Sequence, residues 1–141
     1  MEANFNSTPA APAAEQTPAE TGFKLVDGKL SKECREAIKQ KAKELAKENG
    51  VKRVFPVVVY GEEADEKPVY VAYFKRPDNA TYSRFMSLVQ EDQVQASTVL
   101  AQATIVGGDA ELVNDSELFN FGTMNQLTPI VQSRGGEVVK L

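Results

Sequence analysis

The stretch Val69-Tyr70-Val71-Ala72-Tyr73-Phe74, with the basic corner Lys75-Arg76-Pro77 that follows it, decides the fold. β-Branched and aromatic residues fill positions 69–74, which predicts a strand. Successive side chains of a strand point to opposite faces, and here both the odd-numbered and the even-numbered residues are apolar. We therefore expect helices of the same chain, or a partner, to cover both faces of this strand.

The preceding segment, Val51–Tyr60, is also β-branched and aromatic, and it completes a β-hairpin over Val51–Phe74. Pro56 cannot donate a hydrogen bond to a sheet, so we expect its strand to lie at a sheet edge or to be bulged there. The connecting loop, Gly61–Lys67, carries four carboxylates. It lacks the alternating ligands and the distant Glu of a calcium loop, which favours a solvated hairpin tip over a metal site.

After the hairpin, apolar residues recur at helical spacing and predict two helices, 80–90 and 93–104. Within the first, Phe85 and Met86 are interpreted as core rather than as cofactor contacts. The pair Gly107-Gly108 then predicts a turn. A phosphate-binding loop is disfavoured because no Lys-Ser/Thr follows these glycines.

A final helix is predicted over 115–134, with Asn114-Asp115-Ser116 as its capping segment. Its apolar residues cover a wider arc than one core face needs. Gly122 weakens this helix and Pro129 must kink it or start a new turn. The last five residues, Glu137–Leu141, are apolar enough to add a short strand or to dock on a neighbour.

The N-terminal part divides into a tail and a helix. Residues 1–22 are rich in Ala and Pro, which predicts a disordered tail or a tether that folds on a partner with Phe5 as its anchor. A short strand or hairpin corner is expected over Phe23–Leu30, and a helix over 32–48 starts at Ser31. Acidic residues lie within one turn of most bases on that helix, which indicates a solvated face rather than a nucleic-acid interface.

The amino-acid composition narrows the classes of function that we expect for this protein. The chain has 141 residues, a formal charge of −4, one cysteine and no histidine. Without histidine it lacks the commonest general base and the commonest metal ligand. We expect no enzyme, no catalytic residues, no metal site and no cofactor. No apolar run reaches the roughly 20 residues of a membrane helix, and no secretory signal is recognisable, so a cytosolic protein is expected.

These observations predict an α+β protein with one domain over 23–141. Its order is an N-terminal helix, an antiparallel β-hairpin, and a C-terminal cluster of three or four helices. The flexible tail, the two-faced hairpin and the over-wide final helix are typical of a binding or assembly protein.

The order of motifs adds a family resemblance over about Lys43–Arg134. Tyr73-Phe74-Lys75-Arg76-Pro77 ends the hairpin, a Ser-x-x-Met-Ser-Leu helix follows, and a Gly-Gly-Asp turn precedes Asn114-Asp115-Ser116-Glu117-Leu118-Phe119. This order resembles small tail assembly chaperones of long-tailed bacteriophages. The resemblance implies a non-enzymatic protein, present in the cytoplasm of the infected bacterial host, that coats the tape-measure protein and recruits tail-tube subunits.

Apolar helix faces would then cover stripes of a long helical tape measure. The residues that we expect to bind a partner are Phe119, Phe121, Met124, Leu127, Ile130 and Val131, with Tyr82 and Phe85 as alternatives. The same residues could instead close the domain's own core. Self-association into a homo-oligomer is a further possibility, whereas membrane or nucleic-acid partners are not expected.

Two other functions stay open. A structural tail or connector subunit would remain in purified virions. A small regulatory module would bind a protein or nucleic acid, and the basic residues of helix 32–48 are its only support.

Overall fold

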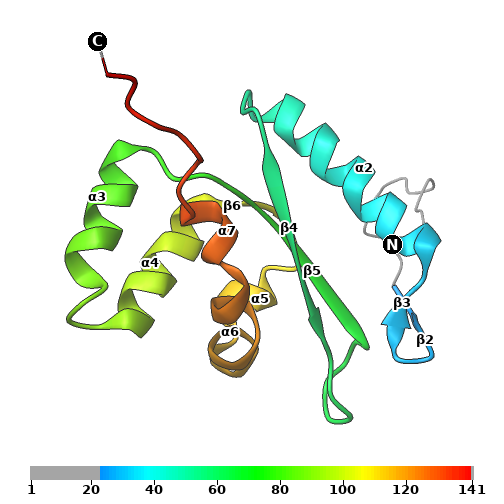
Figure 1. Ribbon diagram of the computed structural model, residues 1–141. Coiled ribbons are helices and arrows are strands. Elements are labelled where there is room, and N and C mark those ends of the chain that lie inside the picture. Colours follow the sequence, from blue (N-terminus) through cyan, green and yellow to red (C-terminus); the bar gives the residue numbers. More distant parts are fainter. Residues whose placement is uncertain (1–22, 141) are drawn as a thin grey trace, which may run out of the picture.

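The computed structural model describes residues 23–140, and the expected disordered tail, with Phe5, lies outside these residues. Three antiparallel strands form the central sheet in the order β4-β5-β6: β4 (Val54–Tyr60), β5 (Val69–Lys75) and β6 (Ile105–Gly108) (Figure 1). β4 and β5 pair from Val54↔Lys75 to Tyr60↔Val69, which confirms the predicted hairpin. Pro56 lies on β4, which is an edge strand as its missing donor predicts.

The third strand corrects the prediction of a turn at Gly107-Gly108. Gly107 pairs with Tyr73 and Gly108 with Ala72, and the register shifts between Tyr73 and Phe74. Gly108 has φ +91°, and a Cβ there would collide with the backbone of β5. A Cβ on Gly107 would lie 3.0 Å from Cδ1 of Leu45. The two glycines therefore let β6 approach β5 and the N-terminal helix closely.

One face of the sheet is covered by α2 (Lys32–Glu48), whose bounds agree with the predicted helix. Ser31 Oγ accepts the amide hydrogen of Cys34 at 3.1 Å, and Asn49 Nδ2 donates to Leu45 O at 2.8 Å. A small hairpin, β2 (Leu25–Val26) and β3 (Lys29–Leu30), precedes this helix, as expected for Phe23–Leu30. The core on this side contains Phe23, Leu30, Cys34, Ile38, Ala42, Leu45, Val54, Val69, Val71 and Tyr73.

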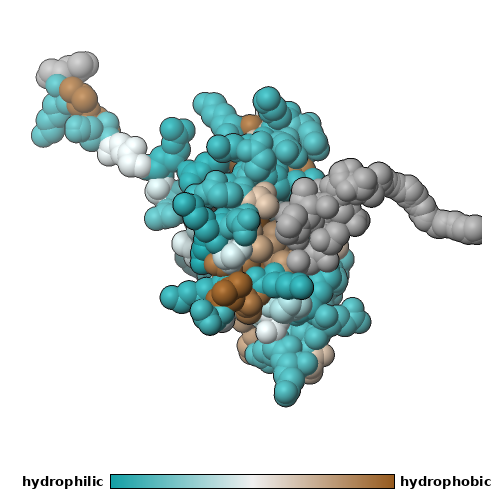
Figure 2. All heavy atoms as spheres, turned by 90° about the vertical axis from the view of Figure 1, so that its right-hand side faces the viewer, coloured by the Kyte–Doolittle hydropathy of each residue, from teal (hydrophilic) through white to brown (hydrophobic). Residues whose placement is uncertain are grey.

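The outward side of α2 is solvated. Its buried residues form one stripe of Cys34, Ile38, Ala42 and Leu45. Figure 2 looks onto this side of the molecule, and hydrophilic side chains cover most of its described surface. The acidic and basic side chains of α2 therefore lie on its solvent-exposed side, as expected for a helix at the surface of a domain.

The opposite face of the sheet is covered by the remaining helices. These are α3 (Asn79–Leu88), α4 (Gln93–Thr104), α5 (Glu111–Asn114), α6 (Ser116–Phe121), the 3-10 helix η2 (Thr123–Gln126) and α7 (Thr128–Val131) (Figure 1). Their core contains Phe55, Val57, Tyr70, Ala72, Phe74, Leu100, Ala101, Leu112, Val113, Phe119, Leu127 and Ile130. Both faces of β5 are thus buried by the chain's own helices, and the predicted α+β class is confirmed.

The single final helix predicted over 115–134 is wrong. Asp115 does start a helix, because its Oδ1 accepts the amide hydrogens of Glu117 and Leu118 at 3.0 Å. Gly122 then leaves the helical region with φ −133° and ψ −75°, and Pro129 begins the separate helix α7. The segment consequently folds as three short pieces over this face of the sheet.

Residues 132–140 follow α7 without regular secondary structure and are exposed. The short strand considered for Glu137–Leu141 is not formed over the described part of that segment. Among residues 23–140, no helix has both the length and the apolar character needed to cross a membrane.

Candidate partner-binding surface

In the antiparallel pair α3 and α4, α3 is the helix of this layer that buries least of itself. Asp78 caps α3 by accepting the Thr81 amide hydrogen at 2.9 Å, and Asp92 caps α4 by accepting that of Gln95 at 3.0 Å. The hydrogen bonds from Thr81 and the nearby charge of Lys75 lower the pKa of Asp78, so the cap is ionised at neutral pH. No residue of α3 is fully buried, whereas α4 buries five.

Tyr82, Met86 and Val89 recur at i, i+4 and i+7 along α3 and its C-cap, and we call them the α3 stripe. Tyr82 is 42% exposed and Met86 is 50% exposed, while Val89 is half-buried. Phe85 lies beside this stripe, half-buried against the core. The α3 stripe is therefore an apolar helix face that the domain does not use for its own folding.

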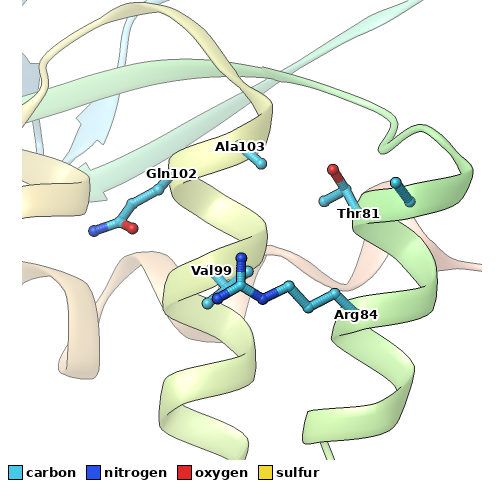
Figure 3. A pocket seen from close by; sticks show the side chains of 6 residues that line it. Thr81, Arg84, Val99, Gln102 and Ala103 are labelled. Atoms are coloured by element: carbon cyan, nitrogen blue, oxygen red, sulfur yellow. The ribbon is translucent and has the colours of Figure 1, made fainter.

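A groove of about 380 Å³ separates α3 from α4 (Figure 3). The Arg84 side chain extends from α3 toward α4 at the level of Val99, and Thr81 and Ala103 lie near the other end. Arg84 is the one charged residue of α3. Most of the residues that line the groove are small, and Arg84 is its one charged residue. This lining suits a side chain from a partner helix better than a charged metabolite.

The structure divides the eight residues expected to bind a partner into three groups. Phe119, Leu127 and Ile130 belong to the core, with at most 4% exposure, so they close the domain instead of facing a partner. Met124, Val131 and Phe85 are half-buried at the margin of that core. Tyr82 and Phe121 are exposed, Phe121 by 80%.

Two exposed apolar residues were missed as surface residues. The interpretation of Met86 as core is wrong, because Met86 is 50% exposed, and Val94 on α4 is 46% exposed as well. The spacing of Tyr82 and Met86 could have indicated a second stripe beside Phe85. Which of two adjacent stripes faces the core depends on where α4 and the sheet lie, and periodicity alone does not provide this.

A polar cluster connects β6 to β5 toward the end of β5 that is opposite the basic corner Lys75-Arg76-Pro77. Lys67 Nζ lies 2.7 Å from Asp109 Oδ1 and 3.8 Å from Glu111 Oε2. Asp109 Oδ2 also accepts the amide hydrogen of Val71 at 2.9 Å, and the Asp109 amide donates to Val71 O at 2.7 Å. The hydrogen bond from Lys67 to Asp109 raises the pKa of Lys67. Every member of this cluster is engaged with another, so its role is structural.

Within residues 23–140, no three His, Cys, Asp or Glu side chains are grouped so that they could hold a metal ion. Cys34 is buried on α2, where it packs as a small apolar residue.

Comparison with known proteins yields one structural likeness. No protein-family model and no curated protein matches the chain. A solved structure, described as the uncharacterised protein rbstp2171 from Bacillus stearothermophilus, is 25% identical to it, with a TM-score of 0.43. The match covers 70% of this chain and 98% of that chain. At this TM-score the likeness does not establish a common fold.

Proposed function

We propose that this chain is a non-enzymatic tail assembly chaperone of a long-tailed bacteriophage. It would bind the tape-measure protein through the α3 stripe and recruit tail-tube subunits in the cytoplasm of the infected host. The observation that carries the proposal is a helix of ten residues without a fully buried side chain, on which the apolar residues Tyr82 and Met86 are exposed.

Helix α3 contributes few buried contacts to its own domain, so its apolar residues need another explanation. Tyr82 and Met86 combine a rigid amphipathic ring with a flexible thioether, two side chains that suit adaptable protein interfaces. Arg84 is the only charge on the helix, so an incoming apolar surface displaces little bound water from charged groups.

The helical geometry favours a helical partner. The α3 stripe has the spacing by which amphipathic helices meet. A tape-measure protein is long and helix-rich in the family that this chain resembles. Its apolar stripes would pack on α3, and many copies of this small protein would keep it soluble.

Co-expression with the long, helix-rich tape-measure protein of the same phage tests the proposal. Size-exclusion chromatography with mass detection should show the large protein soluble and eluting with many copies of this chain. The double variant Tyr82→Ser/Met86→Ser should fold normally and leave the tape-measure protein insoluble.

Val26→Ser is the matched control, because Val26 is 59% exposed and lies on β2, which packs with α2 on the other face of the sheet. The control should bind as the unmodified chain does. If the unmodified chain elutes alone while the tape-measure protein precipitates, or if the double variant still keeps that protein soluble, the proposal is wrong.

A further inference from the structure

We infer that copies of this chain join one another by strand addition: residues 137–140, at the end of the segment 132–140, pair in one copy with the free edge of β4 in the next. This inference is independent of the tape-measure proposal. It concerns two features that neither the core nor the α3 stripe uses, an unpaired sheet edge and an exposed segment that contains the apolar pair Val138-Val139.

The outer edge of β4 has unused hydrogen-bonding groups. Gly61 N donates to Pro68 O at 2.8 Å, which makes 61↔68 a hydrogen-bonded pair in the register that continues from Tyr60↔Val69. Because such pairs alternate along an antiparallel ladder, residues 55, 57 and 59 face β5 while 54, 56, 58 and 60 face outward. Among the described strands none pairs with this edge, and Pro56 removes one outward donor. The donors at Val58 and Tyr60 therefore remain available.

Segment 132–140 has the properties of a donor strand. Glu137, Val138, Val139 and Lys140 follow two glycines, and the valines are 93% and 75% exposed. β-Branched residues favour an extended strand, and Gly135-Gly136 allow it to reorient.

The path of the segment favours a neighbour over the same molecule. Arg76 Nη1 donates to Gln132 O at 3.0 Å, which fixes the point where the segment leaves the domain. From there it runs away from β4 and out from the body of the domain (Figures 1 and 2). Every residue from 132 to 140 is exposed in this position.

Charges support the pairing in either strand direction. Four carboxylates follow β4 directly, on Glu62, Glu63, Asp65 and Glu66. Arg134 and Lys140 flank Glu137–Val139 on its two sides, so one cation lies toward this acidic loop whether the added strand is parallel or antiparallel to β4. Each copy carries one donor segment and one acceptor edge, which is the arrangement that lets head-to-tail contacts repeat.

Oligomer mass as a function of concentration tests the inference. The full chain should elute above its monomer mass of 15.4 kDa and dissociate on dilution. Val138→Pro removes a strand donor and should raise the half-dissociation concentration by about tenfold or more. Ser133→Pro is the control, because it adds a proline to the same segment ahead of the glycines and should leave association unchanged. Tyr82→Ser/Met86→Ser should also associate normally, which separates this inference from the tape-measure proposal.

Disulfide trapping identifies the contact. A Tyr60→Cys chain mixed with a Val138→Cys or Val139→Cys chain should give a crosslinked heterodimer under oxidation. A chain that stays at 15.4 kDa over roughly a hundredfold concentration range overturns the inference, as does Val138→Pro protein that associates like the unmodified chain. A Tyr60→Cys/Val139→Cys chain that crosslinks only within itself also overturns it, because the segment would then pair with its own edge.

Discussion

Asp109→Ala is expected to destabilise the protein far more than removal of its ion-pair partner Lys67. Asp109 Oδ2 accepts the amide hydrogen of Val71, a residue only 3% exposed, at 2.9 Å. Without that acceptor, a buried donor on the central strand loses its partner, which costs about 1–3 kcal/mol. The ion pair adds less, because the Lys67 side chain is 42% exposed and such pairs contribute about 0–1 kcal/mol. We therefore expect a loss of about 2–3 kcal/mol for Asp109→Ala and below about 1 kcal/mol for Lys67→Met.

Urea denaturation followed by far-UV circular dichroism measures both variants, since the chain has no tryptophan. Asp109→Asn separates the two contributions, because its amide oxygen can still accept from Val71 while the charge is lost. Its stability should lie close to that of Lys67→Met. Equal losses for Asp109→Ala and Lys67→Met would refute the reasoning, since they would mean that the Val71 amide does not depend on Asp109.

Three further outcomes are expected. Gly108→Ala should cost more than about 2 kcal/mol, because Gly108 has φ +91° and its missing Cβ would collide with β5, whereas Gly135→Ala in open space should change the urea midpoint little. Phe119→Ala should cost about 3–5 kcal/mol and Phe121→Ala less than about 0.5 kcal/mol in the same assay, because they are 3% and 80% exposed. The pKa of Lys67 is higher in the folded state than its value of 10.5 in the unfolded chain, so Lys67 keeps its charge to higher pH when the protein is folded. The ion pair therefore contributes fully to the free energy of unfolding below pH 10.5, and this contribution is lost as pH rises through the folded pKa. The stability difference between the unmodified chain and Lys67→Met should consequently shrink in strongly alkaline buffer, and a constant difference would contradict this assignment.

Local sequence determined the elements whose signals lie within a few residues of one another. Ser31 and Asn49-Gly50 delimit α2 because a side-chain acceptor starts a helix and an Asn-Gly pair ends it. The two apolar faces of β5 follow from alternation alone, and they require a layer on each side of the sheet. Pro56 predicted an edge strand because proline has no amide hydrogen, and an inner strand needs that hydrogen to bond with its neighbour.

Tertiary structure decided the features whose causes lie far apart in the chain. Gly107-Gly108 has the local signature of a turn, and it forms a strand instead because Gly108, with φ +91° and no space for a Cβ against the backbone of β5, can pair there. The final segment breaks at Gly122 and Pro129 into pieces that pack on one face of the sheet. Phe119 and Phe121 lie on opposite sides of α6, and the packing of this helix on the sheet decides that Phe119 is buried and Phe121 exposed. Tyr82 and Met86 are exposed because α4 and the sheet contact the adjacent stripe through Phe85. Periodicity identifies apolar stripes, but only the packing of the other elements decides which stripe is buried and which remains at the surface.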